Sequence, residues 1–157
     1  MNKTELENIL PHRQDMMLLD TCSKSSDGKA HATYTIKGDE FFLRGHFPDN
    51  PVVPGVILCE IMAQACCVLI VDTGDKSKTS DNADGSKSVN NNETHKKPIA
   101  YFTGIKEAKF RDVVRPLDLL KVECEIIRKM ANFYFAKGTI KVGEKVVASA
   151  EFSFAVV

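Results

Sequence analysis

The chain has 157 residues, a length typical of one domain, and its 21 basic and 21 acidic side chains give no net charge. This balance excludes a global basic field that would collect nucleic acid or anionic membrane, and an acidic excess that would attract basic partners. A hydrophobic content of 43% excludes wholesale disorder. No signal peptide and no uninterrupted apolar run of ~18 residues is present, so we expect a soluble, cytoplasmic protein with no membrane span.

The cysteines are odd in number, form no C-x-x-C pair and lie mostly within one apolar run. This usage indicates buried free thiols in a reducing compartment rather than a disulfide framework, and we predict no metal site. The five are Cys22, Cys59, Cys66, Cys67 and Cys124.

The N-terminal part predicts one short helix and a β-hairpin. Residues 2–10 form the helix, which Asn2 or Thr4 caps and Pro11 ends. A strand begins in the apolar run at 16–19 and leads to the turn signal Asp27-Gly28. Residues 29–36 alternate apolar and polar side chains, which predicts the second, half-buried strand.

A second helix is predicted over residues 56–71, after an irregular, proline-rich segment at 41–54. In this helix only Glu60 and Gln64 are clearly polar, so it should be buried on nearly all sides. The following stretch, 74–97, has only Ala83 and Val89 as apolar members, and we expect it to be a disordered polar surface insertion.

The rest of the chain predicts β-structure, with strands at 99–110, 119–129, 132–142 and 146–156. The short loops between them favour an antiparallel meander. The fold class is therefore α+β, a single domain over 1–157 in which a sheet wraps around one long central helix. Because one sheet leaves such a helix partly bare, a second copy of the chain is a natural cover.

Glu60 and His46 are the candidate catalytic side chains. A carboxylate on an apolar helix must be paired with a cation, neutralised by a proton or used in catalysis. Burial raises the pKa of Glu60 and the nearby helix N-terminus lowers it, which suits an acid that exchanges protons near neutral pH. A salt bridge or a water-satisfied buried acid is the structural alternative for Glu60, and a satisfied surface or core histidine is the alternative for His46. Together in one apolar pocket they make a metal-free general acid/base pair.

The helix start at Pro54-Gly55 adds a third catalytic element. Free backbone N–H groups at a helix N-terminus stabilise an oxyanion, and a glycine lets an acyl group approach closely. Base, acid and oxyanion donor together indicate proton abstraction α to a carbonyl with loss of a β-leaving group.

At these residues the sequence resembles the β-hydroxyacyl-acyl-carrier-protein dehydratases of the FabZ type. The combination of its motifs in order is highly specific, and the similarity covers nearly the whole chain except the insertion. The matching motifs are L-P-H-R at 10–13, G-H-F-P at 45–48, P-x-x-P-G-V at 51–56, E-I-M-A-Q at 60–64, Y-F-T-G-I at 101–105 and K-F-R at 109–111.

The resemblance implies a hot-dog fold, a homodimer and often a homohexamer built as a trimer of dimers. It implies removal of water from a (3R)-3-hydroxyacyl chain on acyl-carrier protein to give the trans-2-enoyl thioester, with no cofactor. His46 would take the C2 proton, and Glu60 of the partner subunit would help the C3 hydroxyl leave, directly or through water. The backbone N–H of Gly55 or Val56 would hold the thioester oxygen. Related dehydratase-isomerases carry Asp at the position of Glu60, which favours the plain dehydratase.

The resemblance also implies roles for residues around the pair. The acyl tunnel would be lined by Phe47, Val53, Pro54, Gln64 and Tyr101, with Tyr101 as a gate. A buried strand tyrosine is the alternative. The acidic carrier protein and its phosphopantetheine phosphate would dock on the cations Lys109, Arg111 and Arg115, or these side chains form an ordinary solvated strand end. Asp112 departs from the family pattern, which has a cation there.

Two other classes of function remain open. One is another enzyme of the same fold, a thioesterase or a CoA-specific hydratase. A thioesterase needs a carboxylate placed to activate water on the carbonyl, but the His46/Glu60 pair fits elimination better. A non-catalytic acyl-binding protein would keep the pocket without the pair, so the presence of both residues counts against it.

Overall fold

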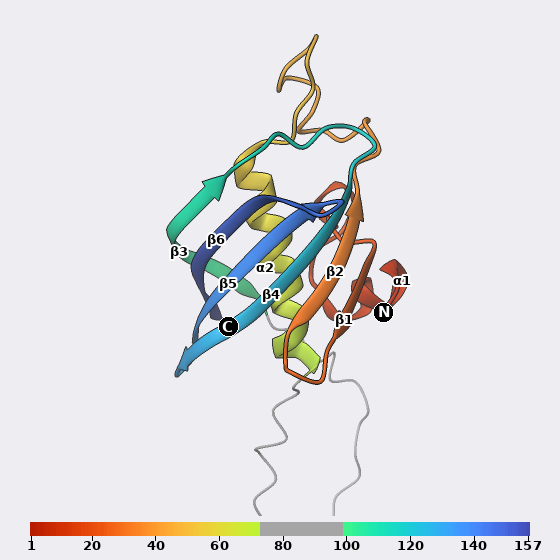
Figure 1. The fold of residues 1–157 in the computed structure, drawn as a ribbon. Helices are drawn as coiled ribbons and strands as arrows, with labels where there is room; N and C mark the ends of the chain where they lie inside the picture. Colours follow the sequence, from red (N-terminus) through yellow and green to blue (C-terminus); the bar gives the residue numbers. More distant parts are fainter. Residues whose placement is uncertain (73–98) are drawn as a thin grey trace, which may run out of the picture.

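The computed structural model describes residues 1–72 and 99–157. A six-stranded antiparallel sheet curves around one long helix, α2 (Gly55–Asp72), as Figure 1 shows. The insertion predicted at 74–97 lies outside the described residues. The α+β, hot-dog prediction is confirmed, and so is the predicted helix at 56–71, which begins one residue earlier at Gly55.

The sheet has the order β1-β2-β4-β5-β6-β3. Its strands are β1 (Thr21–Lys24), β2 (Ala30–Thr35), β3 (Ala100–Phe110), β4 (Leu119–Met130), β5 (Phe133–Val142) and β6 (Lys145–Val156). The predicted meander is right for β4, β5 and β6 but wrong for β3, which pairs with β6 at the far edge. The free edge of β4 is taken by β2, so the chain must cross from one side of the sheet to the other between β3 and β4.

The N-terminal segment covers the side of α2 that faces away from the sheet. Helix α1 (Lys3–Ile9) begins with a capping box in which Asn2 and Glu5 exchange hydrogen bonds. The strand predicted to begin at residue 16 starts only at Thr21, because residues 14–16 form a 3₁₀ turn, η1 (Gln14–Met16). The buried apolar side chains of 17–19 pack into the core instead, so part of the cover that we expected from a second copy comes from the chain itself.

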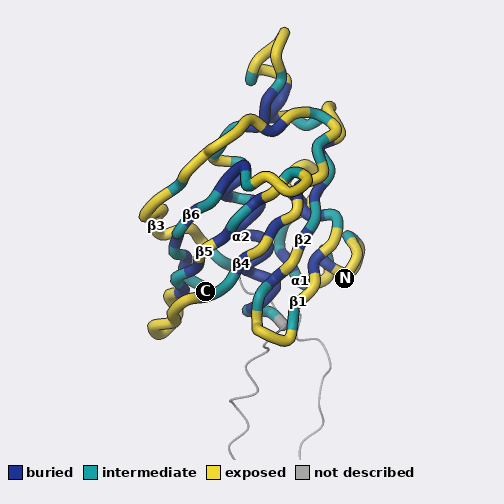
Figure 2. Tube along the Cα trace, viewed as in Figure 1, coloured by how far each residue is buried: buried dark blue, intermediate teal, exposed yellow. Residues whose placement is uncertain are grey.

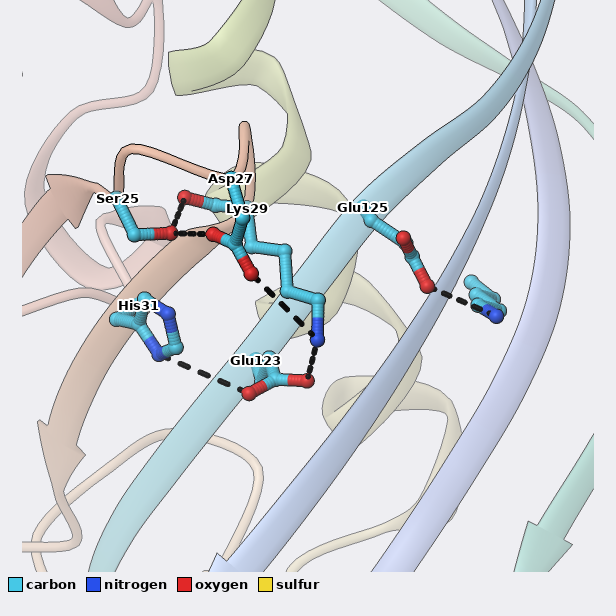
Figure 3. A network of polar contacts seen from close by, with 7 residues as sticks. Ser25, Asp27, Lys29, His31, Glu123 and Glu125 are labelled. Atoms are coloured by element: carbon cyan, nitrogen blue, oxygen red, sulfur yellow. Dashed lines mark hydrogen bonds and ion pairs between the residues drawn. The ribbon is translucent and has the colours of Figure 1, made fainter.

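The two faces of the sheet differ, as strict alternation requires. The inner face presents buried apolar side chains to α2, for example Val122 and Ile140, and Figure 2 shows this buried interior. The outer face carries ion pairs between neighbouring strands. Lys29 and His31 of the first hairpin both approach Glu123 of β4, at 2.9 and 3.9 Å (Figure 3).

Helix α2 packs tightly against the sheet at Gly138 of β5. A Cβ at this position would lie 2.8 Å from Cys124 Sγ and 2.9 Å from Met62 Sδ. The Cys124 thiol also donates to the backbone carbonyl of Met62 at 3.3 Å. The absence of a side chain at residue 138 therefore sets the distance between helix and sheet.

We expect Gly138→Ala to lower the free energy of unfolding by about 1–3 kcal/mol, because overpacking forces the helix and sheet apart. Urea denaturation measures this change. Gly104→Ala is the matched control, since its Cβ would meet only Ser153 Oγ at an ordinary 3.6 Å. Equal stability of the two variants would contradict this account of the contact.

Candidate active site

Glu60 lies on the side of α2 that faces the N-terminal segment. Its Oε1 atom is 2.8 Å from Gln64 Nε2 and 3.3 Å from His12 Nε2. Burial alone raises the pKa of Glu60, but the hydrogen bonds from His12 and Gln64 outweigh it and hold the pKa below its usual value. The free protomer therefore keeps Glu60 as a carboxylate at neutral pH, whereas the sequence predicted a group that exchanges protons near neutrality.

Gln64 connects this carboxylate to the N-terminal segment. Its side chain is only 1% exposed, and its Nε2 donates both to Glu60 and to the backbone carbonyl of Met16 at 2.8 Å. Its Oε1 accepts from the backbone N–H of Leu18 at 3.0 Å. One turn of helix separates residues 60 and 64, so both side chains point the same way. Gln64 thus fixes both the segment and the acid.

His46 belongs to the segment between β2 and α2, which stands out from the body of the protein in Figure 1. Its Nδ1 lies 2.9 Å from the backbone carbonyl of Val52, and its ring stacks on Phe47 at a centroid distance of 4.3 Å. Because a carbonyl only accepts, Nδ1 must carry a proton. In the neutral ring Nε2 then has a free lone pair and can act as a base.

The structure does not bring His46 and Glu60 together within one chain. No hydrogen bond or ion pair between them is present in the part of the chain that the structure describes. His46 lies on a projecting segment, whereas Glu60 is engaged by His12 and Gln64 beside the N-terminal segment. The family resemblance implies that the two residues meet across two protomers, and this stays a prediction.

The first turn of α2 offers backbone donors. The helix bonds begin with the N–H of Ile57, which donates to Pro54 O at 3.0 Å, and no acceptor for the N–H of Gly55 or Val56 is found among the described residues. The structure adds a reason for glycine at residue 55. The Phe110 ring of β3 occupies the place of a Cβ, with carbon atoms 2.7–2.9 Å from that position.

The predicted tunnel residues fall into two groups. Val53 and Pro54 come directly before α2, where Val53 is buried, whereas Phe47 is exposed in the projecting segment beside His46. Tyr101 is exposed as well, and it lies near the other end of β3 from Phe110, roughly 25–30 Å away by the rise of a strand. Within one chain Tyr101 is thus distant from the helix N-terminus, and a gate there requires a second copy.

The predicted docking cations gather near the start of α2. Arg115 donates to Asn50 Oδ1 at 2.6 Å, which ties it to the projecting segment. Arg111 donates to Ser149 Oγ at 2.7 Å, and Lys109 pairs with Glu107 at 2.9 Å. Asp112, which departs from the family pattern, is paired with Lys145, and this contact lowers the pKa of Asp112.

The core also contains titratable thiols. All five cysteines are free and buried, and burial raises the pKa of Cys67 to about 12 and that of Cys22 to about 11. No cluster of three or more His, Cys, Asp or Glu side chains with metal-binding geometry occurs in residues 1–72 and 99–157. Within the same ranges no helix is both long and apolar enough to cross a membrane.

His12 is the site residue that the sequence did not single out for a role. It was matched only as part of the L-P-H-R motif. The sequence feature that could have indicated His12 is its position directly after the helix-ending Pro11, close to the apolar residues that cover α2. Its contact with Glu60 spans 48 positions of the chain, and no local pattern specifies such a contact.

A family model described as a FabA-like domain matches residues 10–151. Curated relatives carry the name 3-hydroxyacyl-[acyl-carrier-protein] dehydratase FabZ. The protein from Clostridium tetani is 39% identical, with 96% of this chain and 93% of its own length covered. The protein from Clostridium perfringens is 34% identical, with 99% of each covered.

Solved structures share the fold at lower identity. The dehydratase heterocomplex ApeI:P from Xenorhabdus doucetiae has a TM-score of 0.72 at 20% identity, covering 96% of this chain and 89% of the other. A putative thioesterase from Ralstonia eutropha has a TM-score of 0.56 at 16% identity, covering 86% and 83%. At these identities the likeness concerns the fold alone.

We expect Gln64→Leu to lower the free energy of unfolding by about 2 kcal/mol or more, because it leaves the Leu18 N–H and the Met16 carbonyl without their partner. Thermal and urea unfolding measure the change. Glu60→Gln is the control, since it keeps Gln64 and both of its backbone contacts, and it should remain close to the wild type. A destabilisation of equal size in both variants would place the effect on the carboxylate instead.

Proposed function

The chain belongs to the FabA-like family, and from this premise we propose that it is a 3-hydroxyacyl-[acyl-carrier-protein] dehydratase, a hydro-lyase of fatty-acid elongation. Its substrate is a (3R)-3-hydroxyacyl thioester on acyl-carrier protein, and its product is the trans-2-enoyl thioester. The family model covers most of the chain, and the relatives of that name align over nearly their full length.

The observation that carries the proposal is the orientation of His46. The Val52 carbonyl holds the proton on Nδ1, which leaves the lone pair of Nε2 free to remove a proton from C2 of the substrate. The electron pair of the C2–H bond then forms the C2–C3 double bond, and the C3–O bond breaks. In its neutral form the ring is thus oriented as a base before the substrate arrives.

Glu60 receives the departing hydroxyl group, directly or through a water molecule. To leave as water this group needs a proton, and Glu60 supplies it only in its protonated form. In the free protomer the hydrogen bonds of His12 and Gln64 favour the carboxylate. A bound acyl chain that expels water increases the desolvation of Glu60, which favours the neutral acid at the stage where the proton is used.

The first turn of α2 stabilises the charge that develops on the thioester oxygen. The N–H groups of Gly55 and Val56 are the donors, and the positive end of the helix adds to their effect. No cofactor takes part in this scheme, because the thioester carbonyl itself acidifies C2.

The active form is proposed to be at least a homodimer that pairs through β3, with a homohexamer as the larger assembly. Strand β3 is the edge of the sheet, and its apolar side chains Phe102, Ile105 and Phe110 are 41%, 47% and 50% exposed in a single chain. A long exposed apolar edge strand is normally covered. Pairing there supports a site that takes His46 from one protomer and Glu60 from the other.

The carrier protein is proposed to dock beside the projecting segment, on Lys109, Arg111 and Arg115. These cations lie near the start of α2, so a phosphopantetheine arm anchored on them enters close to His46. The ion pair with Lys145 offsets the negative charge of Asp112 and so reduces its repulsion of an acidic partner. The five free thiols suit the cytoplasm as the place of action.

We expect purified protein to interconvert 3-hydroxyacyl and trans-2-enoyl thioesters on carrier protein without releasing thiol. His46→Ala and Glu60→Gln should each lower kcat by about 100-fold or more, because each removes one proton-transfer group. Absorbance of the enoyl thioester and a free-thiol assay measure the two reactions.

Each alternative predicts its own result in this assay. Thiol release identifies a thioesterase, equal turnover of CoA thioesters identifies a hydratase, and binding without turnover identifies an acyl-binding protein. Persisting interconversion in both variants would contradict the assigned roles of His46 and Glu60.

A mixture of the two inactive variants tests whether the site is shared. If His46 and Glu60 come from different protomers, random re-association of unfolded and refolded His46→Ala and Glu60→Gln chains restores about a quarter of the wild-type activity, because half of the dimers are mixed and each holds one intact site. If both residues come from one chain, the mixture stays inactive. Refolded wild-type protein alone is the control for yield.

A further inference from the structure

His12 makes its polar side-chain contact with Glu60. The Nε2 atom lies 3.3 Å from Glu60 Oε1, and both side chains are 22% exposed. On its other side the ring borders a small cavity, and Nδ1 is buried without a hydrogen-bond partner among the described residues. The cavity is lined by Leu10, Pro11, His12, Cys67, Ile70, Val71, Ala100 and Val156.

The turn after α1 presents this side chain to α2. Pro11 ends the helix, and the Arg13 guanidinium donates to the backbone carbonyls of Leu10 and His12 at 2.8 and 2.5 Å. These bonds fix the backbone on both sides of the imidazole.

The surroundings of the contact contain few other charges. Helix α2 contributes Glu60 itself, the neutral amide of Gln64 and the buried thiol of Cys67, whose pKa is raised. The N-terminal segment contributes His12, while the Arg13 guanidinium is engaged by backbone carbonyls. Strands β3 and β6 contribute only the apolar Ala100 and Val156 to the cavity.

We propose that His12 is a positioning residue for Glu60: its Nε2–H holds Oε1 together with the Gln64 amide, so that Oε2 is the oxygen turned to the substrate. The buried Nδ1 has no acceptor, which favours the tautomer with the proton on Nε2, where the carboxylate accepts it. This inference rests on the proposed dehydratase function and adds a role for the L-P-H-R segment.

The contact determines in which direction the loss of His12 shifts the pKa of Glu60. A hydrogen bond to the ionised carboxyl group favours that form, so its removal raises the pKa of Glu60. The carboxyl group also loses one of its two fixed donors and can rotate about its last bonds. Misplacement of a reacting group by about 1 Å lowers the rate by up to about 100-fold.

The test uses His12→Leu, which places an apolar side chain against the apolar cavity and should fold. In the full-length enzyme we expect kcat to fall about 10- to 100-fold with little change in KM, because only the acid is misplaced. The ¹³C signal of the Glu60 carboxyl group, assigned by its loss in Glu60→Gln, should titrate at higher pH than in the wild type.

Three further variants separate positioning from structure. His12→Gln places an amide donor near the position of Nε2 and should recover most of kcat and the wild-type titration, whereas the shorter His12→Asn should not. His31→Leu removes the outer-face histidine that pairs with Glu123 (Figure 3) and should leave kcat and the Glu60 titration unchanged.

The outcomes distinguish this inference from the proposed function. An active wild type in which His12→Leu leaves the Glu60 titration unchanged overturns the inference, even if the melting temperature falls. An inactive wild type overturns the proposed function, and a shifted Glu60 titration in His12→Leu then still supports the contact between the two residues.

Discussion

The burial of Gln64 on an apolar helix, with the partly buried Glu60 one turn before it, is the constraint on which the rest of the structure depends. Glu60 and Gln64 face away from the sheet, where an uncovered helix would meet water and a covered one must satisfy them. The N-terminal segment covers this side of the helix with apolar side chains and also supplies polar partners. These are the backbone carbonyl of Met16, the backbone N–H of Leu18 and the imidazole of His12. The N-terminal segment therefore both covers the core and holds Glu60 in place.

This constraint explains which sequence predictions were right. Strands β2, β4, β5 and β6 follow local periodicity and α2 follows a long apolar run, and their bounds agree with the predictions within one or two residues. The apolar run at 16–19 looked like the start of a strand, yet Leu18 gives its N–H to the Gln64 side chain rather than to a neighbouring strand. An apolar run in the sequence predicts that its side chains are buried. Whether it forms a strand or a loop depends on the groups to which its backbone is hydrogen-bonded.

The site was predictable in its residue types but not in its assembly. Glu60 stands out because a carboxylate conflicts with its apolar helix, and Gly55 because it opens that helix after Pro54. His46 stands out because it lies in the irregular segment before the helix. The contact of His12 with Glu60, the crossover of β3 and the packing of Phe110 on Gly55 are all non-local, so no spacing in the sequence encodes them. The lowered pKa of Glu60 also escaped prediction, because it depends on two donors whose positions only the fold supplies.

The separation of the predicted site residues along β3 fits the proposed dimer. One end of this strand packs on the helix start beside the cations, and the other end carries Tyr101 near the C-terminal end of α2. Two copies joined antiparallel along β3 would place the Tyr101 end of each strand beside the Phe110 end of the other. Such pairing would cover the apolar edge and bring a distant aromatic to the mouth of a shared site. In the proposed dimer, each chain would therefore carry all of the proposed catalytic residues but contribute only half of each site.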